Sequence, residues 1–222
     1  QSDTAPRSTG RGYAALHTSS LDATLLMTTL RQAVCHLEST APYSQGNFLA
    51  TPRAAKMKAD EHDALYWRER AHTSRDGPDV GKMFIPAQQF KNALLDAAKF
   101  LGMRVAGKGQ ATYSKHFAAG VMVPRPLVLP DIVAAMEPEL VMCSADGKPG
   151  GAKKVLRRFP VVKSWTGRVD FIIADETIDA ETFKLHIAHA GSLIGIGRWR
   201  PIKNGNYGRF VVKSCDITPY TP

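Results

Sequence analysis

The chain has 222 residues, of which 44% are hydrophobic and 22% are charged. This balance is typical of a folded globular domain, and the sequence contains no run of about 18 apolar residues that would span a membrane. No apolar segment follows Gln1, so we expect no signal peptide and a cytoplasmic protein that does not contact membranes. The formal net charge of +9 favours a polyanionic partner.

The basic residues are concentrated in two parts of the chain. Residues 104–168 hold 11 Lys and Arg against four Asp and Glu, and residues 195–213 hold five basic residues and no acid. Between them, residues 169–194 hold five acids and one Lys. Charge that is segregated in this way creates local fields that attract nucleic acid, although an unevenly charged solvated surface is the simpler alternative.

The three cysteines are widely separated in the sequence. Their number is odd and they form no CxxC pair, which argues against a disulfide framework and against a zinc site. We expect small buried side chains in a reducing compartment at the positions Cys35, Cys143 and Cys215.

The first third of the chain alternates between flexible and ordered segments. Residues 1–20 are rich in Ser, Thr, Gly and Ala and are predicted to form a flexible arm. The Thr and Val content of residues 23–37 favours a strand. Residues 39–82 are polar and irregular, which predicts a long excursion with a short helix near Lys56–Arg70.

A helix is predicted to begin at the segment Phe84-Ile85-Pro86 and to stop at Gly102, because proline suits the first turn and glycine the end. Its apolar residues are spaced as on one face of a helix. They are Phe90, Leu94, Ala97, Ala98 and Leu101.

The second half of the chain is predicted to contain three strands, a helix and a last strand. A short strand at 121–123 precedes a proline-interrupted lobe at 124–153, and strands at 155–162 and 168–174 are predicted to pair as a hairpin. Asp179 is predicted to cap a helix. The buried face of that helix is expected to consist of Phe183, Ile187, Ala190 and Ile194, with a final strand at 209–217.

The order strand, helix, strand, strand, helix, strand predicts an α+β fold with a ferredoxin-like, RRM-like βαββαβ core. We expect one domain over residues 21–222, with insertions at about 39–82 and 104–153. Two helices on one face would leave the other face of the sheet open, and RRM proteins bind RNA on that face.

The strongest motif is the glycine-rich segment 191–210 between the second helix and the last strand. Its glycines permit close backbone approach and positive φ, its basic residues suit phosphates, and its aromatic residues suit stacking on bases. A single G-x-G occurs here after a helix rather than after a strand, so a dinucleotide-binding site is not predicted.

Two segments together resemble the repeat-associated RNA-binding (RAMP) superfamily of CRISPR effector complexes. Residues 191–210 are similar to its glycine-rich loop, and Phe84-Ile85-Pro86-Ala-Gln-Gln-Phe90-Lys91-Asn-Ala93-Leu94 is similar to its IPGSSLKGALR signature. Ala87-Gln88-Gln89 replaces Gly-Ser-Ser, and Asn92 replaces the second glycine. The resemblance covers about residues 84–101 and 155–215. It is nearest to the backbone subunit that polymerises along a guide RNA, or to a phage- or plasmid-encoded relative, and so implies a role in antiviral defence.

The resemblance and the basic segments together give the candidate nucleic-acid-binding residues. The glycine-rich segment contributes Gly195, Gly197, Arg198, Trp199, Arg200, Lys203, Tyr207 and Arg209, and the helix signature contributes Lys91. A basic run interleaved with Tyr113 and Phe117 contributes Arg104, Lys108, Lys115 and His116. A basic loop, which lacks the order of a P-loop, and the strand after it contribute Lys148, Lys153, Lys154, Arg157 and Arg158.

These residues favour a binding module without cofactors or catalytic residues. The expected partners are single-stranded RNA, or single-stranded DNA, together with copies of the chain or other effector subunits. One alternative is a metal-dependent ribonuclease that uses acids of the first excursion, namely Asp60, Asp63, Asp76 and Asp79. A second alternative is a phage-encoded assembly protein or a single-stranded-DNA-binding protein of the same fold.

Two histidine-containing groups are weaker candidates for metal sites. Asp60-Glu61-His62-Asp63 holds potential ligands, but adjacent residues rarely converge on one centre, so a solvated loop is the favoured interpretation. His186 and His189 lie near the apolar face of the second helix, where packing is favoured over ligation.

Overall fold

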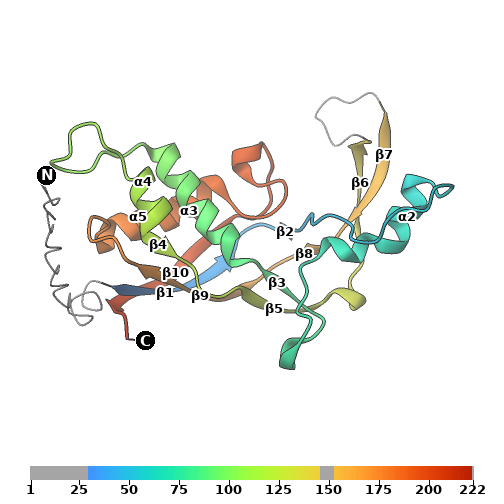
Figure 1. Ribbon diagram of the computed structural model, residues 1–222, viewed down its shortest axis with the longest axis horizontal. Helices are drawn as coiled ribbons and strands as arrows, with labels where there is room; N and C mark the ends of the chain where they lie inside the picture. Colours follow the sequence, from blue (N-terminus) through green and yellow to red (C-terminus); the bar gives the residue numbers. More distant parts are fainter. Residues whose placement is uncertain (1–29, 146–152, 222) are drawn as a thin grey trace, which may run out of the picture.

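A computed structural model describes residues 30–145 and 153–221 (Figure 1). Three predictions fall wholly or partly outside these residues: the arm at 1–20, positions 23–29 of the strand predicted at 23–37, and Lys148. The strands are β1 (Arg31–Ser39), β2 (Tyr43–Ser44), β3 (Lys82–Ile85), β4 (Val121–Met122), β5 (Leu127–Ile132), β6 (Glu139–Ser144), β7 (Lys154–Phe159), β8 (Val161–Val162), β9 (Thr166–Ile173) and β10 (Phe210–Pro219). The α-helices are α2 (Ala59–Tyr66), α3 (Ala87–Leu101), α4 (Ser114–Gly120) and α5 (Ala180–His189).

The central sheet has four strands in the order β10-β1-β9-β4, and every neighbouring pair is antiparallel. Helices α3 and α4 lie between β1 and β4 in the chain, and α5 lies between β9 and β10. This is the strand order of a ferredoxin-like split βαβ unit. The predicted α+β fold class and βαββαβ core are therefore confirmed.

Helices α3, α4 and α5 cover one face of this sheet and bury the alternate side chains of its strands (Figure 1). On β1 these are Ala33, Cys35 and Leu37, which point to the same face because side chains alternate along a strand. Three aromatic rings, those of Phe90, Trp165 and Phe210, meet with their centroids 6.0–6.2 Å apart. This aromatic cluster joins α3 to the sheet.

Each of the two long core helices has one limit at the residue predicted for it, the end of α3 and the start of α5. Helix α3 ends at Gly102, which adopts a left-handed φ of 57°. Helix α5 begins after Asp179, whose carboxylate accepts a hydrogen bond of 2.7 Å from the Thr182 backbone N–H. That bond satisfies one of the amide groups left unpaired at a helix start. It also lowers the pKa of Asp179.

The predicted hairpin between residues 155–162 and 168–174 is wrong. Strand β7 pairs with β6, β8 pairs with β2, and β9 enters the central sheet beside β1. Pro160 is buried between β7 and β8, and Trp165 packs into the core. The Trp165 backbone N–H donates to the Ser39 hydroxyl at 2.7 Å, which directs the chain onto the edge of β1.

Two other boundaries differ from the prediction. Phe84 and Ile85 end strand β3 rather than opening helix α3, because a residue before proline is restricted to extended backbone. The strand predicted at 121–123 is confirmed as β4, an edge strand of the central sheet, and helix α4 precedes it within the range of about 104–153 that was predicted as the second insertion. Beyond β4 the chain forms β5, which pairs with β3, and the β6–β7 ribbon.

The uncovered face of the central sheet carries acidic side chains, unlike the RNA-binding face of an RRM protein. Asp170 and Asp216 lie opposite Val34 in the register of β9, β1 and β10. Arg168 on the same face donates to Asp170 at 2.7 Å. Among the described strand residues, no Phe, Tyr or Trp side chain alternates onto this face, where the imidazole of His36 is exposed. The expectation that RNA binds there therefore finds little support in the side chains.

None of the helices within residues 30–145 and 153–221 is long and apolar enough to cross a membrane. The three cysteines are free thiols. Cys35 is buried as predicted, whereas Cys143 and Cys215 are only partly buried. Cys35 and Cys215, 180 positions apart in the sequence, are direct neighbours across strands β1 and β10.

Candidate nucleic-acid interface

The glycine-rich segment folds into a loop that is bound to the backbone of residues 42–46. The Arg198 backbone N–H donates to the Ser44 carbonyl at 2.9 Å, and the Gly208 N–H donates to the Pro42 carbonyl at 2.7 Å. At Gly197 a Cβ atom would lie 2.6 Å from the Ser44 carbonyl oxygen. Glycine is therefore required here because the two backbones touch.

Arg198 is held between two aromatic rings. Its Cζ atom lies 3.2 Å from the centroid of Phe159 and 3.6 Å from that of Trp199. Burial lowers the pKa of Arg198, yet an arginine remains protonated at neutral pH. Its Nη2 lies 3.6 Å from the Cys143 sulfur, and its buried Nη1 has no hydrogen-bond partner among the described residues. Arg198 therefore joins the loop to β7 and retains an unused donor.

The two aromatic residues of the loop pack against their surroundings. Trp199 adopts a positive φ of 54° and meets Tyr207 edge to face at a centroid distance of 5.7 Å. The Tyr207 hydroxyl donates to Glu139 Oε1 at 2.6 Å, and this bond raises the pKa of Tyr207. Both rings are half-buried, so the loop uses them to hold its own shape.

The Arg157-Arg158 pair predicted to bind nucleic acid surrounds a fully buried carboxylate, that of Asp63. Arg70 Nη2 lies 2.6 Å from Asp63 Oδ1, while Arg157 Nη1 and Arg158 Nη1 lie 3.8 and 3.9 Å from the two carboxylate oxygens. The Arg158 backbone N–H also donates to Asp63 Oδ2 at 2.7 Å. Three arginines thus share one negative charge, and this end of the molecule keeps an excess of positive charge.

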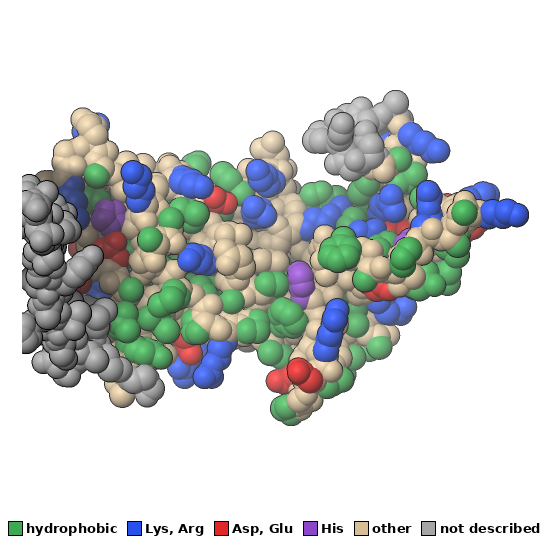
Figure 2. Space-filling view, viewed as in Figure 1, with side chains coloured by type: hydrophobic (Ala, Val, Ile, Leu, Met, Phe, Trp, Pro, Cys, Tyr) green, Lys and Arg blue, Asp and Glu red, His purple; other side chains and the backbone are tan. Residues whose placement is uncertain are grey.

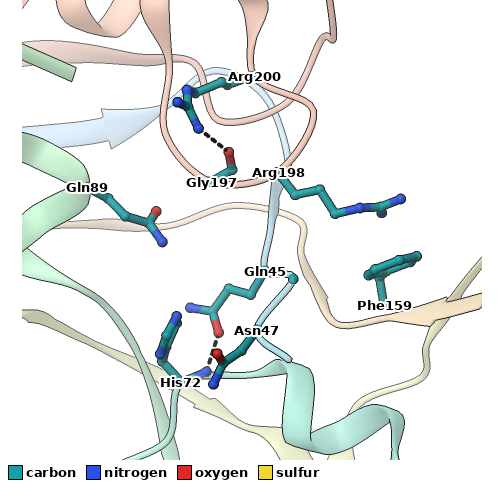
Figure 3. A pocket seen from close by; sticks show the side chains of 9 residues that line it. Gln45, Asn47, His72, Gln89, Phe159, Gly197, Arg198 and Arg200 are labelled. Carbon is teal, nitrogen blue, oxygen red and sulfur yellow. Dashed lines mark hydrogen bonds between the residues drawn. The ribbon is translucent and has the colours of Figure 1, made fainter. Parts of the chain in front are cut away.

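A cavity of about 530 Å³ opens where the glycine-rich loop, the start of α3 and the segment after β2 meet (Figure 3). It is called the loop pocket below. None of the nine residues that line it carries a carboxylate. They are Gln45, Gly46, Asn47, His72, Gln89, Phe159, Gly197, Arg198 and Arg200.

The polar side chains of the loop pocket present hydrogen-bond donors. Gln89 Oε1 accepts from the Tyr43 hydroxyl at 3.0 Å, and Asn47 Oδ1 accepts from the Phe48 N–H at 3.0 Å. The carbonyl ends of both amides are therefore occupied, which leaves their NH₂ groups as donors. Arg200 Nη1 donates to the Gly197 carbonyl at 3.2 Å, and its Nη2 lies 4.0 Å from Asp96.

The structure brings only part of the predicted set to the loop pocket. Gly197, Arg198 and Arg200 line it. Arg157 and Arg158 directly precede the lining residue Phe159 on β7. The remaining described candidates lie outside its lining. Arg209 donates to the Ser192 carbonyl, Gly195 is buried, Lys91 is half-buried on α3, and Lys153, Lys154 and Lys203 are exposed.

The basic run at 104–116 lies at the other end of the molecule, around the α3–α4 connection (Figure 1). Its interleaved aromatic residues, Tyr113 and Phe117, are buried, so they cannot stack on bases as expected. His116 Nδ1 lies 2.6 Å from Asp175 Oδ2, and Lys108 donates to Thr177 at 3.2 Å. Arg104 and Lys115 are exposed. Figure 2 shows many Lys and Arg side chains over the opposite end, near α2, β6 and β7.

The acidic and histidine clusters have structural partners. Residues 60–63 lie on helix α2 rather than in a solvated loop, and His62 Nε2 lies 2.9 Å from the Thr51 carbonyl. His186 is buried, its Nδ1 lies 2.7 Å from the Thr182 carbonyl, and burial lowers its pKa. Its packing role is confirmed. Among the described residues, no group of three potential ligands is placed to hold a metal.

Six of the nine residues that line the loop pocket were not predicted, and four of these six have polar side chains: Gln45, Asn47, His72 and Gln89. The first three belong to the excursion at 39–82, whose irregular sequence has no periodicity. Gln89 lies inside the helix signature, at a position where the family pattern has serine. The polar side chain at this position, near the start of a helix, was the one sequence feature that could have indicated a binding residue.

No family model matches the chain, and neither does any curated protein. Solved structures are similar to it, among them the following three. The first is a cryo-EM structure of the Type III-B Cmr-beta bound to cognate target RNA, at 10% identity and a TM-score of 0.44, which covers 89% of this chain and 63% of that chain. The second is a CRISPR RNA-guided surveillance complex, at 11% identity and a TM-score of 0.36, which covers 82% and 66%.

The third is Cmr6 from Pyrococcus furiosus, at 12% identity and a TM-score of 0.36, which covers 84% of this chain and 99% of that chain. The chain spans less than two thirds of the length of the first two.

Proposed function

We propose that the chain binds single-stranded nucleic acid, with RNA as the expected ligand, and that the loop pocket holds a phosphate of its backbone. One observation carries this proposal. The two motifs that resemble the RAMP superfamily meet at this pocket, because Gln89 comes from the helix signature and Gly197, Arg198 and Arg200 come from the glycine-rich loop.

The chemistry of the pocket supports an anion. Guanidinium groups and side-chain NH₂ groups donate hydrogen bonds, and hydrogen bonds to an ionised phosphate are about twice as strong as neutral ones. No carboxylate among the lining residues opposes a phosphate. The surrounding arginines, which share Asp63, add to the local positive potential.

Single strands fit this site better than a duplex. The pocket is concave, and its volume lies in the range of pockets that hold a small molecule about the size of a nucleotide. Proteins recognise flexible single strands by admitting splayed nucleotides into such hollows, whereas they recognise duplex RNA across broad grooves. The assembly part of the proposal, with copies of the chain or other effector subunits as partners, rests on the two sequence motifs alone.

A metal-dependent ribonuclease finds less support in the contacts. Asp63 is buried and paired with arginines, so its carboxylate is committed to folding. Asp79 pairs with Lys82 at 2.8 Å. Asp60 lies on α2, and Asp76 lies just before a separate 3₁₀ turn.

The proposal predicts that binding depends steeply on salt and that Arg200 contributes to this dependence. Arg200→Ala is expected to weaken the affinity for a single-stranded RNA by about tenfold or more, since a charge-assisted hydrogen bond contributes about 1.5–3 kcal/mol and about 1.4 kcal/mol is a factor of ten. The slope of log affinity against log salt should fall by about 0.7–1. Fluorescence anisotropy over a range of salt concentrations measures both quantities.

Arg168→Ala is the matched control, because it removes the same charge from the open face of the sheet. It should leave both the affinity and the slope nearly unchanged. An assembly protein that does not bind nucleic acid would show no binding even at low salt. Equal effects of the two variants would place the contact elsewhere on the surface.

A further inference from the structure

Phe48 is the most exposed large apolar side chain in the described part of the protein, with 76% of its surface accessible to solvent. A ring of this size in water is unfavourable unless a partner covers it, since burying a phenylalanine contributes roughly 1.5–3 kcal/mol. It lies directly after Asn47, which lines the loop pocket.

The backbone around Phe48 is firmly held. The Asn47 N–H donates to the Arg70 carbonyl at 3.0 Å, and the Gln45 N–H donates to the Pro160 carbonyl at 3.3 Å. The Gln45 side chain donates to the Phe84 carbonyl at 2.7 Å and accepts from the His72 N–H at 2.6 Å. The ring is therefore displayed from an anchored segment, which lowers the entropy cost of binding.

A second cavity, of about 550 Å³, is lined by Phe48. It adjoins the loop pocket, because Asn47 and His72 line both cavities. Arg68 and Arg75 also line it. Its one carboxylate, that of Glu69, accepts hydrogen bonds from the backbone and the hydroxyl of Thr51, and these bonds lower its pKa. An apolar ring thus lines one cavity together with two arginines, next to the donor-lined loop pocket.

We propose that Phe48 is a platform on which an unpaired nucleobase stacks, in the same strand whose phosphate the loop pocket holds. This inference rests on the proposed function. An aromatic face next to positive charge matches a nucleotide, in which a flat base is joined to an anionic backbone. A protein segment would have to bring acidic groups to Arg68 and Arg75 as well as an apolar surface to the ring.

The test compares Phe48→Ala and Phe48→Tyr with the wild-type chain. The ligands are a single-stranded RNA and the same RNA with successive abasic positions. Phe48→Ala should weaken binding of the intact RNA about tenfold, in the range measured for stacking residues, and Phe48→Tyr should bind like wild type. One abasic position should weaken binding to wild type and have no further effect on Phe48→Ala. The salt slope should stay constant, because no ionic contact is lost.

Leu65→Ala is the control, since Leu65 is a comparably exposed apolar residue, 62% accessible, on helix α2. It should bind like wild type. If wild type binds RNA but Phe48→Ala binds equally well, the inference is wrong and the proposed function stands. If wild type binds no RNA, both are wrong. A change in oligomeric mass in Phe48→Ala without RNA would identify the ring as a protein contact and also overturn the inference.

Discussion

Replacing Asp63 with alanine is expected to lower the free energy of unfolding by about 3–5 kcal/mol. The Asp63 carboxylate is fully buried and compensates Arg70, whose side chain is only 13% accessible. Its removal leaves that guanidinium without a counter-charge. The Arg158 backbone N–H also loses its acceptor, so helix α2 and strand β7 lose the contact that joins them.

Chemical denaturation of the purified chain measures this loss. Asp60→Ala is the control, because Asp60 is exposed on the same helix and its replacement is expected to change stability by no more than about 0.5 kcal/mol. Asp63→Asn should lie between the two, since an amide oxygen can still accept from Arg158. A loss below about 1 kcal/mol for Asp63→Ala would show that the arginines are stable without their shared carboxylate.

Gln89→Glu is expected to weaken RNA binding by tenfold or more. The exchange is nearly isosteric and keeps an acceptor for the Tyr43 hydroxyl, so the fold should be retained. It replaces a donor in the loop pocket with a negative charge. Two like charges about 4 Å apart repel by about 4 kcal/mol at an effective dielectric constant of 20, and solvent and salt reduce this value.

Gln88→Glu provides the matched control for this variant. Gln88 is the preceding residue of helix α3, is exposed, and bonds Asn92 on the helix surface. Both exchanges alter the net charge equally, so a difference between them reports position alone. Affinities that fall by the same factor in the two variants would mean that no anion lies in the loop pocket.

The fold was predictable where local signals and topology agree. Proline before α3, Gly102 after it and Asp179 before α5 set helix limits that depend on neighbouring residues only. With two helices and four strands in this order, the chain has few compact arrangements. The strand partner of β7 was not predictable, since Lys154–Phe159 pairs equally well by composition with any β-rich segment.

The candidate site was predicted in part, because residue type is visible in a sequence and contact is not. The basic character of 198–209 was evident, but nothing local shows that Arg198 stacks on Phe159, which lies 39 positions away. Nor does the sequence near Asp63 show that Arg158 binds it from a distance of 95 positions. Phe48, Gln45 and Asn47 lie in an excursion without periodicity, where only tertiary structure assigns neighbours.

The most direct test of the account is to map where RNA touches the protein. Single-stranded RNA that carries 4-thiouridine is crosslinked to the wild-type chain, and the modified peptides are identified by mass spectrometry. We expect crosslinks in residues 45–48, 72–75 and 197–200, which surround the loop pocket and Phe48. Crosslinks confined to the open face of the sheet, at residues 166–172 and 211–218, would contradict it.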